Sequence, residues 1–344
     1  MELDPRDDIG VEATTPHISN WSGTNIITSP LTFGSGQGGS ELNVEAAAGS
    51  LTIDATSALV NNANNNANDL NLQGAGIGAW NAALSDSLMA LNVLKRGTGT
   101  WTLGGMNTYS GTTTVAGGTL LVTNQNSGSG NVLVQTGGTL GGNGAVIAAP
   151  VSVAGGGTLA PGLPGANGTG VMTINNTLTL ADGSFTSVKI NKAAATNDTI
   201  VGVGTLTYAG TLVVSNVSGT LTATDKFPIF HASGYTGAFA AISPSSPGAG
   251  LVWNTNTLAT DGTLRLAVGL PTTPTPITAK VVGGNMLQLS WPTAYTGWIL
   301  LAQTNSLGVG LGTNWVPVAN STSTNVITVP ITTGNASVFY RLQY

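Results

Sequence analysis

Cysteine is absent from this 344-residue chain, and Asp, Glu, Lys and Arg together make up only 7% of it, against about 25% in an ordinary soluble domain. Without cysteine, the chain holds neither disulfides nor thiolate zinc sites. The formal net charge is -5 with nine basic residues, so a basic patch for nucleic acid is not expected. A hydrophobic content of 41% argues against charge-driven disorder.

Long apolar runs are also missing. No run reaches the ~20 residues of a membrane-spanning helix, so no transmembrane segment is expected. Residues 1–10 are acidic and show neither the basic nor the apolar region of a signal peptide. Residues 97–181 contain no charged side chain at all. The surface formed by this stretch is therefore expected to be neutral.

Glycine is abundant, with 49 residues, and it punctuates short runs in which β-branched or apolar residues alternate with Thr, Ser or Gln. Such runs predict short strands closed by turns. Residues 79–93 are the one stretch with a helix-like pattern, enough for one or two turns.

The tetrapeptide Gly-Gly-Thr-Leu occurs three times, beginning at Gly117, Gly137 and Gly156. A period of about 20 residues, built from three short strands, predicts one coil of a parallel β-helix, whose stacked coils share an apolar interior. Residues 31–268 at this period predict about 12 coils. A β-sandwich or a closed barrel is the alternative all-β fold.

The predicted fold class is therefore all-β, with a parallel β-helix at 31–268 followed by a small antiparallel β-sandwich at 277–344. Residues 269–276 hold three prolines and predict a linker. In the sandwich, similar in layout to fibronectin type III domains, Trp291, Trp298 and Trp315 are the expected core anchors. Residues 1–30 are interpreted as an N-terminal arm. A possible donated strand there and just beyond it contains Asn25, Ile26, Ile27 and Leu31.

Residues 94–122 read LKRGTGTWTLGGMNTYSGTTTVAGGTLLV. This stretch resembles the autotransporter-associated β-strand repeat, also called the passenger-associated transport repeat. The resemblance implies a right-handed β-helical segment of a large secreted or surface-exposed bacterial protein. The chain end at 338–342 also looks like the terminal β domain of long repeat-bearing proteins of environmental bacteria. The residues that match the repeat pattern are Lys95, Gly97, Gly99, Trp101, Leu103, Gly105, Asn107, Tyr109, Gly111, Thr113, Val115, Gly118, Leu120 and Val122.

Catalytic and metal sites are not assigned, and no cofactor is expected. Glycoside cleavage needs two neighbouring carboxylates, but the mid-chain acids do not repeat at the coil period and are interpreted as structural: Asp182, Asp198, Asp225 and Asp261. His17 and His231 are the only histidines, too few for a histidine metal site. Asp4, Asp7 and Asp8 are interpreted as a solvated terminus, with weak calcium binding as the alternative.

Three functions remain open. The first is an extracellular structural protein that self-associates head to tail into a cell-surface filament, through the β-helix ends or a donated strand. The second is a surface adhesin or autotransporter passenger fragment that binds glycans, with Trp101, Tyr109 or Trp253 as stacking platforms. For Trp101 and Tyr109, as residues of the repeat, a core or cap role is the preferred interpretation. The third is a carbohydrate-active β-helix enzyme. The first is preferred because no catalytic set is visible in the sequence.

Overall fold

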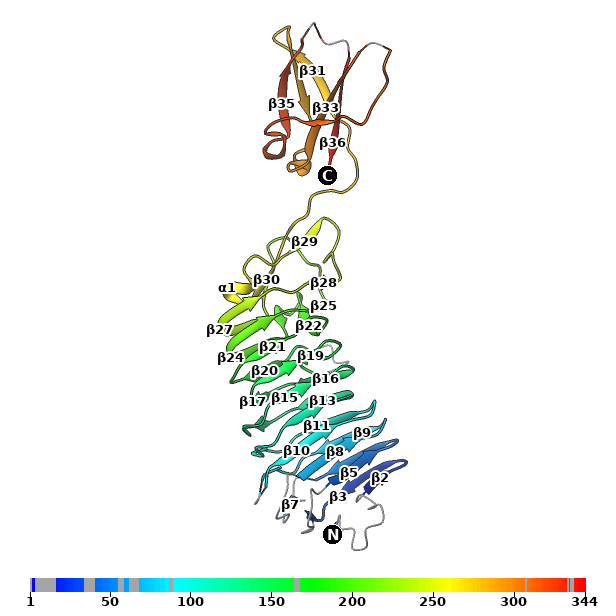
Figure 1. Ribbon diagram of the computed structural model, residues 1–344, viewed down its shortest axis with the longest axis vertical. Coiled ribbons are helices and arrows are strands. Elements are labelled where there is room, and N and C mark those ends of the chain that lie inside the picture. The colour runs from blue at the N-terminus through cyan, green and yellow to red at the C-terminus, as the bar shows by residue number, and fades with distance from the viewer. Residues whose placement is uncertain are drawn as a thin grey trace. The chain divides into compact units, whose positions relative to one another are not determined.

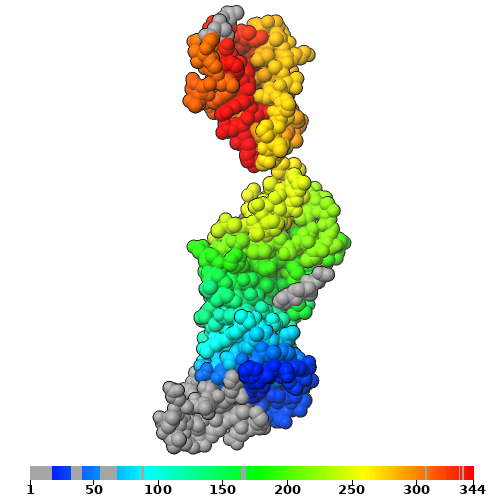
Figure 2. All heavy atoms as spheres, turned by 90° about the vertical axis from the view of Figure 1, so that its right-hand side faces the viewer, coloured from blue at the N-terminus to red at the C-terminus, as the bar shows by residue number. Residues whose placement is uncertain are grey.

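The computed structural model describes residues 2–3, 17–33, 41–54, 59–61, 68–86, 89–163, 168–306, 308–332, 334 and 337–344. The chain divides into two compact units. The solenoid unit comprises Met1–Pro247 and Trp253–Ala267, and the C-terminal unit comprises Gly248–Val252 and Val268–Tyr344. Within the solenoid unit, successive segments of the chain are stacked in chain order (Figure 1), and the same order is visible on its surface (Figure 2).

The first row of the stack is an 11-stranded sheet in which strands from successive coils pair in parallel. A short antiparallel strand, β23 (Thr196–Asn197), is added to β22. The strands of the main path are β3 (Thr24–Ile27), β6 (Ser50–Ile53), β9 (Ile77–Trp80), β11 (Thr100–Leu103), β13 (Gly118–Val122), β16 (Gly138–Gly142), β19 (Thr158–Pro161), β22 (Phe185–Asn191), β25 (Thr211–Ser218) and β28 (Ala241–Ser243).

Each coil contributes further strands that stack beside the first sheet, and most of these strands belong to one 13-stranded sheet, which forms the second row of stacked strands and part of a third. The long strand β24 joins the two rows, because Thr199–Val201 pair with β20 and Leu206–Thr207 pair with β21. Its strands are β2 (His17–Asn20), β5 (Glu41–Ala46), β8 (Asn68–Gln73), β10 (Leu91–Lys95), β12 (Thr113–Val115), β14 (Gln125–Asn126), β15 (Val132–Val134), β17 (Ala145–Ile147), β18 (Val151–Val153), β20 (Val171–Ile174), β21 (Leu178–Leu180), β24 (Thr199–Tyr208) and β27 (Phe230–Gly237). The remaining parallel sheet is β1 (Glu2–Leu3), β4 (Leu31–Phe33) and β7 (Leu59–Asn61).

The repeated tetrapeptide is explained by this stack. In each copy a glycine with positive φ turns the chain into the first row: Gly118 (φ 61°), Gly137 (φ 80°) and Gly156 (φ 78°). The threonines that follow lie in register on neighbouring coils, and the leucines after them point inward. Trp101, Leu120, Leu140 and Leu159 form one register column and are all fully buried. Each such side chain contributes about 1.5–3 kcal/mol of burial.

The parallel β-solenoid prediction is confirmed, but the coils are not of equal length. Thr100 is the register partner of Thr119, and Thr119 is that of Thr139, which agrees with the period of the glycine motif. Later coils are longer, because Thr158 pairs with Phe185 and Thr211 pairs with Ala241. The expected 12 coils are therefore too many for this length of chain, since the motif period holds only in the middle of the solenoid.

Two further expectations differ from the structure. The described residues of the range 79–93 are not helical: β9 ends at Trp80, residues 81–86 and 89–90 are irregular, and β10 begins at Leu91. Residues 17–31, assigned to or next to an N-terminal arm, belong to the stack, since β2 pairs with β5 and β3 pairs with β6. Asn25, Ile26 and Ile27 therefore lie in the first coil described, and Leu31 begins β4.

The last coils of the solenoid unit are covered by a small cap. Here β26 (Lys226–Pro228) pairs antiparallel with β30 (Thr263–Val268). The short helix α1 (Leu258–Asp261) packs against β27 and ends at Gly262, whose φ is 66°. Strand β29 (Leu251–Asn254) precedes α1 in the chain. None of the helices among the described residues is long and apolar enough to cross a membrane.

The C-terminal unit contains two small antiparallel sheets. One consists of β31 (Thr278–Val282), β32 (Met286–Ser290) and β35 (Val326–Pro330), and the other of β34 (Val316–Pro317), β33 (Ile299–Asn305) and β36 (Ser337–Gln343). Two 3-10 turns, Thr293–Tyr295 and Ser321–Ser323, complete the unit. Leu289, Trp291 and Leu300 form its core, and Trp298 is also buried. Trp315 is not a core anchor, because it is only half-buried with the Arg341 guanidinium 4.4 Å above its ring.

Candidate functional site

The repeat residues at 95–126 form a buried network. Lys95, the last residue of β10, is fully buried, and its ammonium group donates hydrogen bonds to three carbonyl oxygens: Arg96 at 2.6 Å, Gly97 at 3.1 Å and Gly117 at 2.9 Å. Gly117 belongs to the next coil, so this side chain ties two coils together. Burial lowers the pKa of Lys95 to about 8. A Cβ on Gly118 would lie 2.5 Å from the carbonyl oxygens of Gly97 and Gly99, and its φ is positive, which accounts for glycine at that corner.

The two aromatic repeat residues are also interior groups. The indole nitrogen of Trp101 donates to the Gln73 carbonyl at 2.9 Å in the preceding coil. The hydroxyl of Tyr109 lies 2.6 Å from the Thr113 hydroxyl and accepts a hydrogen bond from the Asn126 amide at 3.2 Å. Burial raises the pKa of Tyr109, so its phenol stays neutral. With 0% and 1% exposure, neither ring is a surface platform for sugars.

The remaining repeat residues support this network. The side-chain oxygen of Asn107 accepts the backbone N–H of Leu84 at 3.0 Å. Leu103 and Leu120 are buried. A Cβ on Gly99 or Gly111 would lie 2.2 Å from a backbone oxygen of the preceding coil, and the φ of Gly97 is 68°. The glycines of the repeat are thus required where neighbouring coils approach closely. The buried hydrogen bonds of Lys95, Trp101 and Tyr109 explain why these three residue types occur in the repeat.

The four mid-chain aspartates are each interpreted from their surroundings, beginning with the most buried. The Asp198 carboxylate accepts the N–H groups of Gly170 at 2.7 Å and Lys189 at 2.8 Å, and its ion pair with the Lys189 side chain measures 3.2 Å. Burial nevertheless raises the pKa of Asp198. Asp182, in contrast, is an exposed corner residue before Gly183.

Asp225 and Asp261 have dedicated partners. Burial opposes ionisation of Asp225, but hydrogen bonds from Lys192 and Thr222 outweigh it and lower its pKa. The Arg265 guanidinium lowers the pKa of Asp261, with one of its nitrogens 2.6 Å from the carboxylate. These contacts fit the structural interpretation of the aspartates. Among the described residues, no three His, Cys, Asp or Glu side chains gather in a way that could hold a metal ion.

Several concave sites lie near the cap of the solenoid unit, and two of them are lined in part by residues of α1. The first, called the polar cleft here, has a volume of about 410 Å³ and is lined by Gly202, Val203, His231, Ala232, Ser233, Tyr235, Thr260 and Asp261. His231 is exposed there. His17 lies far from it in the stack, as the first residue of β2, and Asp4, Asp7 and Asp8 are outside the described residues.

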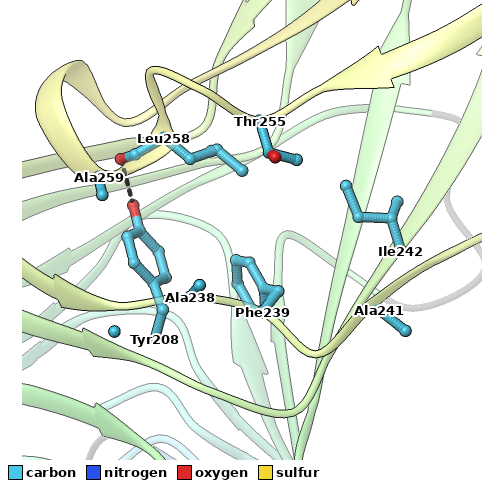
Figure 3. A pocket seen from close by; sticks show the side chains of 9 residues that line it. Tyr208, Ala238, Phe239, Ala241, Ile242, Thr255, Leu258 and Ala259 are labelled. Carbon is cyan, nitrogen blue, oxygen red and sulfur yellow. Dashed lines mark hydrogen bonds between the residues drawn. The ribbon is translucent and has the colours of Figure 1, made fainter.

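The second site, called the apolar cavity, has a volume of about 130 Å³. Figure 3 shows its walls: Tyr208 from β24, the segment around Phe239 and Ile242, and Leu258 of α1. The rings of Tyr208 and Phe239 are 5.0 Å apart, and Phe230 packs against both. The Tyr208 hydroxyl donates to the Leu258 carbonyl at 3.0 Å. The complete lining is Tyr208, Gly237, Ala238, Phe239, Ala241, Ile242, Thr255, Leu258 and Ala259.

Sequence reasoning did not identify either concave site. The one local signal is an unusual density of aromatic residues, since Phe227, Phe230, Tyr235 and Phe239 follow one another closely in a chain that is 6% aromatic. Such a density marks a place where rings pack together.

The fold and this network define a parallel β-solenoid protein whose central coils are held by a repeat of glycine corners, one buried lysine and two buried rings. Residues 93–122 match the family model of the passenger-associated transport repeat. This part of the chain therefore carries a copy of that repeat, as the sequence pattern predicted. A search among curated protein sequences gives no significant match to it.

Proposed function

We propose that this chain is a structural part of a surface-exposed or secreted protein, in which the solenoid serves as a stiff spacer. The observation that carries this proposal is the unbroken parallel register from β3 to β28, with a continuous apolar interior. Each coil contacts only its neighbours in such a stack, so length and stiffness come from repetition rather than from a compact core. The matching repeat family supports the location.

The finer part of the proposal is self-association into a filament through the ends of the solenoid. Its two ends differ chemically, because the cap with α1 covers the last coils, whereas β2 and β3 are the outermost strands of their sheets among the described residues. A contact between two unlike surfaces is heterologous, and a heterologous contact that does not close generates a filament. The uncharged stretch at 97–181 gives the sides of the solenoid no charge repulsion between neighbouring subunits.

Negative-stain electron microscopy and sedimentation velocity over a range of concentrations test this part. Filaments or a concentration-dependent rise in sedimentation coefficient are expected. Removing residues 1–16, which precede β2, separates strand donation from direct contact of the coils: unchanged filaments would exclude strand donation by that segment. A monomer at every concentration would overturn self-association and leave the spacer role standing.

A second candidate, glycan binding by an adhesin, is favoured by the polar cleft. A concave site that combines an aromatic ring with a few placed polar groups is typical of small-molecule binding, and the cleft brings together Tyr235, Ser233 and His231. Saturable binding of neutral oligosaccharides by the monomer, lost in His231→Ala combined with Ser233→Ala, is expected on this proposal. Equal binding by the double variant would exclude the cleft. Hydrolysis of the same oligosaccharides in that assay would instead favour the enzyme alternative.

A further inference from the structure

The apolar cavity has the features of a small-molecule site that is separate from the repeat network. Its walls come from three segments that the cap brings together: β24, the chain from Gly237 to Ile242, and the chain from Thr255 to Ala259. No Asp, Glu, Lys, Arg or His is among its lining residues. A charged ligand would lose its hydration in this cavity without gaining a partner.

The volume of the cavity limits the ligand. Its 130 Å³ is close to the roughly 150 Å³ of a closed apolar cavity, lined by Leu, Ile and Phe, that binds benzene. The cavity thus suits one six-membered ring. It is open to solvent, since five of its lining residues are exposed, so a ligand has a route of entry; these residues are Gly237, Ala238, Ala241, Thr255 and Ala259.

The polar atoms at the cavity wall do not oppose an apolar ligand. The Tyr208 hydroxyl and the Leu258 carbonyl satisfy each other at 3.0 Å. Burial raises the pKa of Tyr208, with Tyr235 and Asp261 adding to the shift, so this phenol carries no charge at neutral pH. The Thr255 hydroxyl is the other polar side-chain group at the wall (Figure 3).

The arrangement of rings favours an aromatic ligand over an aliphatic one. Tyr208 stands edge-on to Phe230 at 5.2 Å and tilted to Phe239 at 5.0 Å. Edge-to-face and tilted contacts between rings contribute about 0.5–1.5 kcal/mol beyond their buried area. An added ring next to Phe239 would extend this cluster.

We infer that the cavity between Tyr208, Phe239 and Leu258 is a binding site for a neutral molecule with a single aromatic ring, and that one hydroxyl on that ring is accepted beside Thr255. The inference does not depend on the proposed spacer or filament role.

The inference is tested by measuring the binding of benzene and phenol to the full chain, with calorimetry or saturation-transfer NMR as the readout. Ala238 lies between Tyr208 and Phe239 (Figure 3) and is exposed at the opening of the cavity, so Ala238→Leu obstructs the opening and is expected to weaken benzene binding at least tenfold. Ala194→Leu, at an exposed turn away from the cavity, is the matched control and should bind as the parent does. Absence of saturable benzene binding by the parent, or equal binding by Ala238→Leu, would overturn the inference.

A second variant keeps the test decisive if Ala238→Leu fails to fold. Thr255→Val removes the hydroxyl while keeping the shape of the side chain, and the backbone carbonyl of Thr255 still accepts the Leu258 N–H. This variant should abolish any preference for phenol over benzene and leave benzene binding unchanged. Bromobenzene soaked into crystals gives the position directly: bromine located outside the cavity would contradict the assignment.

Discussion

The indole ring of Trp101 occupies the space that a side chain on Gly78 would need. The two residues are register partners on β11 and β9, and a Cβ on Gly78 would lie 2.2 Å from a ring carbon of Trp101. A fully buried tryptophan fits into this narrow interior because the preceding coil presents a glycine to it.

Replacing Gly78 with alanine is therefore expected to destabilise the solenoid unit by about 1–3 kcal/mol, the usual cost of overpacking a filled core. Urea denaturation followed by tryptophan fluorescence measures the change. Gly168→Ala is the matched control, because a Cβ there meets no atom within 4 Å. Equal stability of the two variants would show that the Trp101 ring moves away without cost.

Lys95→Met should destabilise the solenoid unit by about 2–3 kcal/mol. The methionine fills a similar volume but donates no hydrogen bond, so the carbonyls of Arg96, Gly97 and Gly117 lose their donor, and a buried group left without a partner costs about 1–3 kcal/mol. Lys226→Met, at an exposed position of the same unit, should change stability by less than about 0.5 kcal/mol. A similar loss of stability in both variants would contradict the role of Lys95 in holding two coils together.

The same lysine makes stability depend on pH. Its pKa is about 8 in the folded chain, against 10.5 for an unperturbed lysine. Between these values the unfolded chain still holds the proton that the folded chain has released, so stability should rise as pH increases from about 8 to 10.5. Below pH 8 both states are protonated and the contribution is constant. Denaturation curves of the parent and Lys95→Met across this range should diverge; parallel pH profiles would rule out the effect.

Tyr109→Phe isolates one hydroxyl of the repeat network. Its removal leaves the buried Thr113 and Asn126 side chains without that partner, and the expected loss is about 1–3 kcal/mol. Tyr344→Phe removes a hydroxyl from a side chain that is 68% exposed and should have no measurable effect. Thermal unfolding followed by circular dichroism compares the two, and indistinguishable melting curves would refute the role of Tyr109.

Two tryptophans of the C-terminal unit form a natural pair of variants. The Trp298 indole nitrogen donates to the Pro271 carbonyl at 2.9 Å, whereas that of Trp291, also buried, has no partner among the described residues. Trp298→Phe should therefore cost about 1 kcal/mol more than Trp291→Phe, the difference being the lost hydrogen bond. Near-ultraviolet circular dichroism during urea denaturation measures both, and the reverse order would contradict this account.

Much of the fold follows from short-range pattern. The Gly-Gly-Thr-Leu copies predict corner, outward threonine and inward leucine, and Leu120, Leu140 and Leu159 lie in one column as expected. The number of coils was wrong because only the central coils carry this motif. The candidate helix at 79–93 was wrong because tertiary pairing of β9 and β10 outweighs a weak local pattern.

The sites are less accessible to sequence reasoning. Lys95 is recognisable as a repeat residue, but one of its three acceptors, Gly117, comes from the next coil, and no local pattern shows that pairing. The apolar cavity combines Tyr208 with Ile242 and Leu258, which only the fold of the cap brings together. The aromatic residues at 227–239 indicate the part of the chain where rings pack together, but they do not indicate that a cavity lies beside them.

The uneven length of the coils determines where this architecture tolerates change. Register between the strands is kept whether the chain between partners is short, as from Thr139 to Thr158, or much longer, as from Thr211 to Ala241. Part of the additional length lies in longer paired strands, such as β24, β25 and β27, and the rest lies between the strands. Extra residues can therefore be accommodated while the inward-facing register stays the same, so relatives of this chain should differ in the length of their coils before they differ in the register of their strands.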